Sequence, residues 1–267
     1  YKPDVALIGI APAGGKLPDA WRHLISDAID AHLEIWSGMH AFISDDPEFA
    51  QQAERKGVRL WDVRRPPANL SVATAAALKT RAFVVLAVGS DCNVGKMTVS
   101  LELQKYASQQ GYKAAFVATG QTGILIAGDG TPLDAIPGDF MSGEVERLVV
   151  AADKAGADII FVEGQGSVVH PGFGAVTLAL MLGSMADAYV LCHLPTRATF
   201  RPDYDIPLPP LPMVVRQYET LMEYHKAPKV RCVALNTFNL SEEDSRKIIQ
   251  DTETLLGLPT TDPIRYG

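Results

Sequence analysis

The sequence predicts an α/β protein in which a domain built on a parallel sheet follows a smaller α/β domain. From residue 81 onwards, short apolar runs alternate with longer segments of helical periodicity, a pattern typical of βα units and a parallel sheet. The first of these runs, residues 83–88, is joined to a helical segment by a glycine-bounded loop that ends in Gly95-Lys96. A strand, a loop of this kind, a lysine and a helix together form a phosphate-binding site.

Composition and charge limit the classes of protein to which the chain can belong. It has 267 residues, of which 47% are apolar, so it can form one large or two small cores. Its net charge of −7 argues against a nucleic-acid or anionic membrane surface, and no apolar run approaches the roughly 18 residues of a membrane span. Cys92, Cys192 and Cys232 lack the paired spacing of a disulfide framework or a zinc site. We expect a cytoplasmic protein that acts on a small-molecule substrate, binds neither nucleic acid nor membrane, and assembles as a homo-oligomer.

Residues 1–65 are predicted to form a Rossmann-like α/β domain. The pattern indicates, in order, a strand at 5–10, a loop at 11–15, a helix at 19–36, a helix at 47–56 and a strand at 58–63. Because the first strand begins so near the start of the chain, we expect further residues to precede it in the natural protein. Residues 66–80 contain two prolines and no clear period, so they are predicted to be a linker.

Residues 81–267 are predicted to form the second domain, with a parallel sheet. Strands are expected at 83–88, 113–118, 158–162, 187–192 and 229–236, and helices at 95–110, 142–156, 174–185, 212–225 and 241–255. The segment 198–212 contains five prolines and is predicted to be an extended loop or a lid. Ligands of such sheets lie at the carboxyl ends of the strands, so the residues that follow each strand are the candidates for a site.

The loop after the first strand of this domain is the predicted cofactor site. Backbone N–H groups, the positive end of the helix dipole and the lysine would all face an anion. The match to G-x-x-x-x-G-K-[ST] is incomplete, because Ser90 replaces the first glycine and Met97 replaces the hydroxyl residue that holds Mg²⁺. The domain is still predicted to be P-loop NTPase-like. The predicted cofactor-binding residues are Gly89, Ser90, Asp91, Cys92, Asn93, Val94, Gly95, Lys96, Met97 and Thr98.

Polar residues that follow three further strands are candidates for holding an anionic substrate. Glycines and short polar side chains follow the strand at 113–118, which suits either contact with a carboxylate or a simple turn. A histidine and an arginine follow the strand at 187–192, and such a pair can grip a carboxylate or a phosphate. The predicted substrate-binding residues are Thr119, Gln121, Thr122, Gly123, Ser167, His193 and Arg197.

Glu163 and His170 are the predicted catalytic residues. Glu163 directly follows an apolar strand, where burying a carboxylate is costly unless it holds a metal ion, a water or a substrate proton. His170 lies in the next loop and is a candidate general base, although a histidine bound within its own loop would look the same in the sequence. Asp139 either stabilises a helix N-terminus or, together with Thr98 and Glu163, faces a metal ion.

Five motifs in the same order resemble one known family. The resemblance covers nearly the whole chain, and the family is a P-loop family long catalogued as a domain of unknown function that includes bacterial D-glutamate N-acetyltransferases. A more distant resemblance is to dethiobiotin synthetase, whose P-loop lysine is followed by a threonine that meets Mg²⁺, where this chain has Met97. The motifs are GSDCNVGKMT (89–98), ATGQTGILIAG (118–128), DFMSG (139–143), VEGQGSVVHP (162–171) and LCHLPTR (191–197).

The resemblance leaves three hypotheses about function. The first is a transferase whose P-loop holds acetyl-CoA and which acetylates the amino group of a small acidic amino acid such as D-glutamate. The second is an enzyme that activates a carboxylate with ATP and Mg²⁺, in which Thr98, Asp139 and Glu163 would lie near the metal. The third is a nucleotide-sensing module without catalysis, switched by the segment 198–212. The absence of a hydroxyl at Met97 favours the transferase.

Overall fold

The computed structural model describes residues 2–10, 16–201 and 204–267, and it divides into two compact units. The first unit comprises Tyr1–Ala68 and Gly120–Ala135, and the second comprises Asn69–Thr119 and Ile136–Gly267. Each unit contains a sheet, and every strand pair in the described part of these sheets is parallel. The predicted α/β class with a parallel sheet is therefore confirmed.

The first unit is a small three-stranded sheet, in the order β1-β2-β3, with helices packed around it. The side chains that form its core include Ile25, Ile29, Ile35 and Phe49. The predicted loop at 11–15 lies outside the described residues. The elements of this unit are β1 (Val5–Ile8), α1 (Asp19–Asp30), β2 (Glu34–Ser37), η1 (Ile43–Asp45), α2 (Pro47–Lys56), β3 (Leu60–Asp62), α4 (Gln121–Ala127) and η3 (Leu133–Ala135).

The predicted helix at 19–36 was wrong in its last six residues. Helix α1 ends at Asp30, His32 adopts a left-handed conformation with φ of 60°, and the chain then enters strand β2. Ile35 of β2 is 1% exposed and pairs with Ala6 on one side and Leu60 on the other. A short apolar run fits a buried strand as well as a helix, so the spacing alone could not place this boundary.

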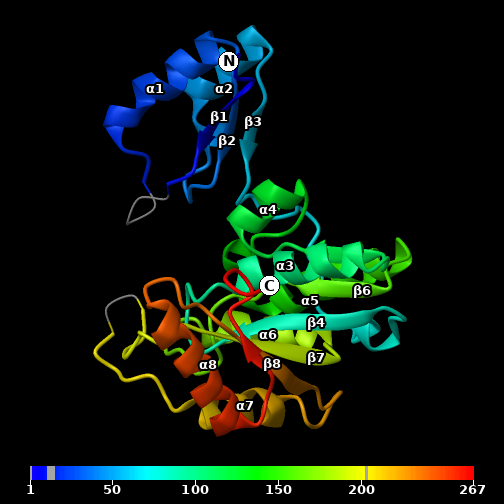
Figure 1. Ribbon diagram of the computed structural model, residues 1–267. Helices are drawn as coiled ribbons and strands as arrows, with labels where there is room; N and C mark the ends of the chain where they lie inside the picture. Colours follow the sequence, from blue (N-terminus) through cyan, green and yellow to red (C-terminus); the bar gives the residue numbers. More distant parts are fainter. Residues whose placement is uncertain (1, 11–15, 202–203) are drawn as a thin grey trace. The chain divides into compact units, whose positions relative to one another are not determined.

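The second unit is a six-stranded parallel sheet in the order β5-β6-β4-β7-β8-β9 (Figure 1). Its strands are β4 (Phe83–Gly89), β5 (Ala114–Val117), β6 (Ile159–Val162), β7 (Ala188–His193), β8 (Lys229–Leu235) and β9 (Thr260–Thr261). Its helices are η2 (Ala76–Lys79), α3 (Lys96–Gln109), α5 (Gly138–Lys154), α6 (Gly174–Ser184), α7 (Leu211–Leu221) and α8 (Glu242–Leu256). No helix among the described residues is long and apolar enough to cross a membrane.

Most elements of this unit lie within a few residues of their predicted bounds. The exceptions are helix α5, which begins at Gly138 rather than at residue 142, and helix η2, which lies within the predicted linker. The short strand β9 ends just before Asp262-Pro263, where the last strand was expected to end. Helix α4, in the first unit, begins where a loop was expected after the strand at 113–118. It is only seven residues long, too short for a clear helical period.

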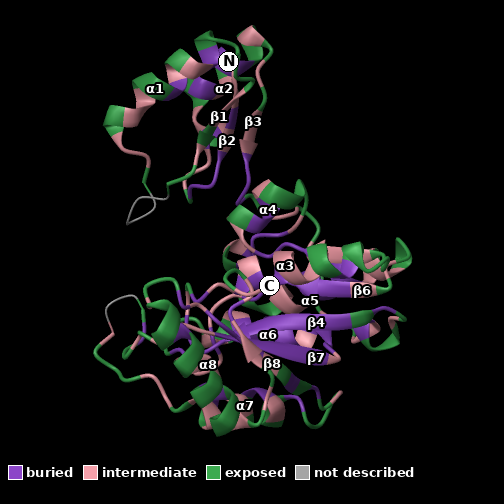
Figure 2. Ribbon diagram, in the orientation of Figure 1, coloured by how far each residue is buried: buried purple, intermediate pink, exposed green. Residues whose placement is uncertain are grey.

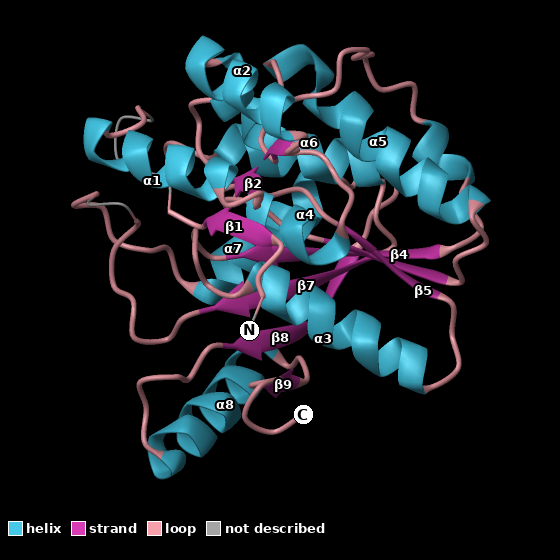
Figure 3. Cartoon of the chain, turned by 90° about the horizontal axis from the view of Figure 1, so that it is seen from above, coloured by secondary structure: helices cyan, strands magenta, loops and turns pink. Residues whose placement is uncertain are grey.

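The order of the strands places the P-loop at the centre of the sheet. Strand β4 lies between β6 and β7 and is almost wholly buried (purple in Figure 2). Helix α3 packs on one side of these strands, and α5 and α6 pack on the other (Figure 3). Since all strands are parallel, the loops that follow β4, β5, β6, β7 and β8 meet at one edge of the sheet.

Helix α5 offers a test of how tightly the second unit is packed. A Cβ atom added at Gly143 would lie 1.8 Å from the backbone oxygen of Ser71, whereas one added at Gly138 would meet nothing within 4 Å. We expect Gly143→Ala to lower the free energy of unfolding by about 1–3 kcal/mol, because backbone must move to admit the methyl group. Gly138→Ala, in the first turn of the same helix, is the matched control and should leave stability unchanged or slightly higher. Equal urea midpoints for the two variants would contradict this packing.

Candidate functional site

The loop between β4 and α3 has unpaired backbone donors, as an anion site requires. Asn93 and Gly95 adopt left-handed conformations, with φ of 50° and 105°, which turn the chain sharply before the helix. Among the described residues, the backbone N–H groups of residues 94–98 have no hydrogen-bond acceptor. Three of these groups belong to the first turn of α3, where the helix dipole adds partial positive charge. The loop can therefore hold a phosphate through its backbone.

Lys96 is buried beneath this loop, with one recorded acceptor for its ammonium group. Its Nζ atom donates to the backbone oxygen of Asp91 at 2.7 Å, and burial lowers the pKa of the amine. An ammonium group has three donors, so a bound anion would supply both the missing acceptors and the opposing charge. The lysine side chain crosses Gly164, where an added Cβ would lie 2.9 Å from Cδ and 1.7 Å from the Ala87 oxygen. Only glycine fits at position 164.

Asp91 joins the P-loop to the segment that follows β7. Its buried carboxylate accepts from the backbone N–H of Cys92 at 2.7 Å, from the Arg197 guanidinium at 2.9 Å and from the backbone N–H of Arg201 at 3.1 Å. Arg197 also donates to the carbonyl oxygens of Cys92 and Asn93. The predicted anion-binding arginine thus lies against the P-loop and is fixed there by a buried ion pair.

Tyr218 of α7 connects the P-loop with the loop after β6, a role that no pattern in the sequence indicated. Its hydroxyl donates to the Gly89 oxygen at 2.7 Å and accepts from the N–H groups of Gly89 at 3.3 Å and Val168 at 3.2 Å. The hydroxyl also lies 3.4 Å from Oγ of Ser167, which is fully buried. Burial raises the pKa of Tyr218 to about 12, so the phenol stays protonated and can donate.

Glu163 and Thr119 bring together the ends of β6 and β5. The Thr119 N–H donates to a Glu163 carboxylate oxygen at 2.8 Å, and the Thr119 hydroxyl donates to the Glu163 backbone oxygen at 2.8 Å. Both residues are buried. The backbone N–H groups of residues 164–167 have no acceptor in the part of the chain that the structure describes, so they are available to a ligand.

Both ring nitrogens of His170 have hydrogen-bond partners in the protein backbone. Nδ1 accepts from the backbone N–H groups of Gly172 at 3.0 Å and Phe173 at 3.1 Å, which places the proton on Nε2, and this nitrogen contacts the Arg201 carbonyl oxygen. The ring packs against Phe173, Phe200 and Tyr204. In this arrangement His170 holds the backbone at Arg201 in place and has no free lone pair for a proton.

Asp91, Cys92 and His170 are the one cluster of potential metal ligands found among the described residues. The cluster does not suit a cation, because Arg197 already neutralises the carboxylate and both histidine nitrogens have partners. The residues predicted to bind a metal ion are not part of this cluster. Asp139 is exposed in the first turn of α5, and Thr98 is half-buried in the first turn of α3.

His193 is held by the P-loop, through a 2.7 Å hydrogen bond between its Nδ1 atom and the Ser90 hydroxyl. Burial, together with the nearby charge of Arg197, lowers the pKa of His193 to about 4. The ring is therefore neutral near pH 7. Of the other predicted substrate-binding residues, Gln121, Thr122 and Gly123 belong to α4 in the first unit, where the Gln121 side chain accepts from Arg64.

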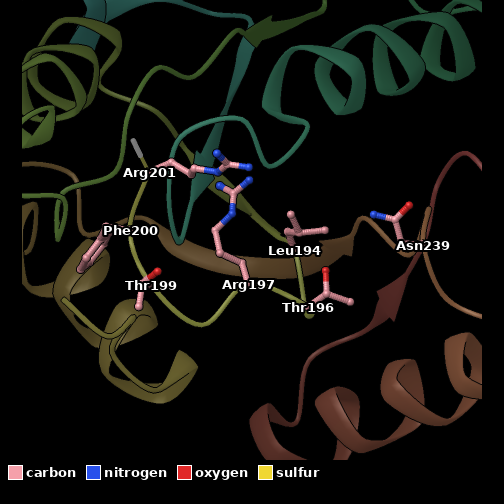
Figure 4. A pocket seen from close by; sticks show the side chains of 7 residues that line it. All are labelled: Leu194, Thr196, Arg197, Thr199, Phe200, Arg201 and Asn239. Atoms are coloured by element: carbon pink, nitrogen blue, oxygen red, sulfur yellow. The ribbon is translucent and has the colours of Figure 1, made fainter. Parts of the chain in front are cut away.

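A pocket of about 380 Å³ lies beside the P-loop segment that Arg197 contacts. Its walls come from the chain after β7 and from the loop after β8, and the ends of the Arg197 and Arg201 side chains point to the same part of it (Figure 4). Sequence reasoning missed Arg201, because no motif spacing marks it within a proline-rich segment. The lining residues are Leu194, Thr196, Arg197, Thr199, Phe200, Arg201 and Asn239.

Comparison with known proteins places the chain in a family. Residues 71–267 match a P-loop domain and residues 1–66 match a Rossmann-like domain, which are the two parts of a family described as a domain of unknown function, DUF1611. The chain belongs to the DUF1611 family. A DUF1611 protein from Anabaena variabilis ATCC 29413, known from a crystal structure, is 40% identical and superposes with a TM-score of 0.95 over 100% of this chain and 78% of its own.

Two curated relatives of this DUF1611 protein have a named activity. A D-glutamate N-acetyltransferase of Tritonibacter scottomollicae is 40% identical over 269 residues, and one of Pseudoalteromonas sp is 36% identical over the same length. Each alignment covers 98% of this chain and 78% of the relative. The predicted resemblance is thereby confirmed, and both domains of the chain fall within it.

Two neighbouring buried tyrosines test the role of the Tyr218 hydroxyl. Tyr218→Phe would leave three backbone groups of Gly89 and Val168 without their partner, so we expect a loss of about 1–3 kcal/mol in the free energy of unfolding. Tyr189, whose ring centroid is 6.0 Å away, has a buried hydroxyl with no partner among the described residues. Tyr189→Phe should therefore be neutral or stabilising. Chemical denaturation of both variants provides the measurement. A larger loss of stability in Tyr189→Phe than in Tyr218→Phe would contradict this account.

His193 should make stability depend on pH below neutrality. Its folded pKa of about 4 lies below the ordinary value of 6.5, so the unfolded chain binds more protons between these values. Stability should fall as the pH is lowered from 6.5 towards 4, by up to about 3 kcal/mol from this residue. His193→Asn should flatten that part of the profile, whereas His225→Asn, at an exposed position, should not. Parallel urea titrations at several pH values provide the measurement, and identical slopes in all three proteins would contradict the prediction.

Proposed function

We propose that this protein transfers an acetyl group from acetyl-CoA to the amino group of a small acidic amino acid of the D-glutamate type. The observation that carries the proposal is the 40% identity, over 98% of this chain, to a protein named D-glutamate N-acetyltransferase. The geometry of the P-loop is compatible with it, because the site provides backbone donors and a buried lysine for an anion.

The P-loop suits the diphosphate of a coenzyme A better than an ATP–Mg²⁺ complex. Met97 stands where a hydroxyl would bind the metal, and the predicted metal ligand Asp139 is exposed. The buried ammonium of Lys96 and the amides of residues 94–98, which have no acceptor within the described structure, need no metal ion to hold phosphate oxygens. These residues therefore fit a cofactor that is bound through its phosphates alone.

Acetylation of an amine by acetyl-CoA forms a C–N bond and breaks the C–S bond of the thioester, and CoA leaves as a thiolate that gains the proton lost by the amine. The reaction needs a group that takes and passes on this proton, and donors that stabilise the negative charge on the carbonyl oxygen. Glu163 is buried at the end of β6, where an amino group bound beside it could pass it a proton. The unpaired N–H groups of residues 164–167 follow it directly and could donate to the oxygen. We assign His170 a positioning role, since both of its nitrogens already have partners.

The first experiment combines ligand binding with turnover. Thermal unfolding is measured with acetyl-CoA, CoA, ATP–Mg²⁺ and GTP–Mg²⁺, and thiol release from acetyl-CoA is followed with D-glutamate, L-glutamate and D-aspartate. A ligand at about 100 times its dissociation constant stabilises a protein by about 2.7 kcal/mol, which such a scan detects. We expect stabilisation by the CoA compounds, its loss in Lys96→Ala, and thiol release that depends on the amino acid. Stabilisation by ATP–Mg²⁺ alone would contradict the proposal and support the carboxylate-activating enzyme.

A second variant tests the proton acceptor. Glu163→Gln keeps an oxygen that can accept from the Thr119 N–H but cannot take a proton, so we expect kcat to fall by about 10²- to 10⁴-fold. Stabilisation by acetyl-CoA should persist in this variant, because the P-loop is unchanged. Full activity in Glu163→Gln, or in a Glu163→Gln, His170→Ala double variant, would rule out the assignment.

A further inference from the structure

At the edge of the sheet where its strands end, the P-loop of the second unit lies between two regions that differ in chemistry. On the side of β6 and β5 are Glu163, Thr119 and the N–H groups of residues 164–167, which have no acceptor among the described residues. On the side of β7 and β8 is the pocket that contains Arg197 and Arg201. A cofactor whose diphosphate lies in the P-loop extends to both sides, so each side receives a different end of it.

The chemistry of CoA decides which end lies where. Its diphosphate joins a thioester-bearing pantetheine arm to an adenosine that carries an additional phosphate on the 3′-oxygen of the ribose. The thioester must reach the group that takes the proton, and Glu163 on β6 is the proposed one. The adenosine end is therefore directed to the opposite side, towards β7 and β8, where the pocket lies.

The charges of the pocket suit an additional phosphate. Arg197 is 11% exposed and paired with Asp91, so this pair adds no net charge. The Arg201 side chain is exposed and has no ion pair or hydrogen bond with the described residues, although its backbone is held on both sides of its Cα atom. Its N–H donates to Asp91 and its carbonyl oxygen contacts His170. The backbone of Arg201 is thus held in place, while the charge of its side chain is unpaired within the described residues.

We propose that the pocket binds the adenosine end of CoA and that Arg201 pairs with the 3′-phosphate. Arg197 forms the wall between this phosphate and the P-loop, while Leu194 and Phe200 offer apolar surface and Asn239 a polar edge. Arg201 is then a specificity residue, which distinguishes CoA from nucleotides that lack a 3′-phosphate. The inference rests on the proposed function, because it requires CoA to be the ligand of the P-loop.

A carboxylate of the amino acid substrate is the other anion that could pair with these arginines. The position of the pocket argues against it, since the pocket is on the side of the P-loop away from β6 and Glu163. Arg197 also makes all of its recorded side-chain contacts with the P-loop residues Asp91, Cys92 and Asn93, which belong to the cofactor site. The two sources of negative charge predict different kinetic effects, so experiment can separate them.

The test is calorimetric titration of CoA and 3′-dephospho-CoA into the full chain and three variants. The unaltered protein should bind CoA about tenfold or more tightly than dephospho-CoA, as expected for a charge-assisted contact. Arg201→Ala should lose this preference, because its affinity for CoA should fall while its affinity for dephospho-CoA stays the same. Arg201→Lys should retain part of the preference. Arg231→Ala, which removes an exposed arginine of β8 outside the pocket, should behave as the unaltered protein. The KM for D-glutamate should be the same in all four proteins.

Two results would overturn the inference while leaving the proposed function intact. One is equal affinity of the unaltered protein for CoA and dephospho-CoA. The other is a raised KM for D-glutamate in Arg201→Ala with CoA binding unchanged, which would indicate that the pocket binds the amino acid. No detectable binding of CoA to the unaltered protein would instead reject the proposed function, and this inference with it.

Discussion

The rest of the site depends on the interactions of the buried Asp91 carboxylate. It lies within the P-loop and binds both the guanidinium of Arg197 and the backbone of Arg201, so it fixes the chain after β7 against the chain after β4. A buried carboxylate with several hydrogen bonds and an opposing charge is stable, whereas one deprived of its partner is costly. The loop that is proposed to bind a phosphate and the wall of the adjacent pocket are therefore a single rigid structure.

Tyr218 serves the same purpose on the other side of the P-loop. Its hydroxyl joins Gly89 to Val168, and through them strand β4 to the loop that follows β6. Neither Asp91 nor Tyr218 needs to touch a ligand to matter for binding. Both fix backbone whose N–H groups remain unpaired within the described structure, and holding such donors in place before the ligand arrives is what gives an anion site its affinity.

The sequence predicted the sheet of the second unit well, and it predicted the position of the loop between β4 and α3, because both follow from local patterns. Apolar runs between helical segments define parallel strands, and glycines before Lys96 define a P-loop. The sequence could not predict contacts between distant segments. Tyr218 looks like an ordinary core residue of an amphipathic helix, His170 looks like a catalytic histidine until its two partners are seen, and the strand at Glu34–Ser37 looks like the end of a helix.

A crystal structure of the full chain with CoA tests the central claim most directly. The account predicts that the diphosphate contacts the backbone N–H groups of residues 94–98, and that Nζ of Lys96 also donates to it. The Asp91–Arg197 ion pair should remain in place, since it builds the site rather than competing for the ligand. A diphosphate bound elsewhere, out of contact with Lys96, would contradict the account.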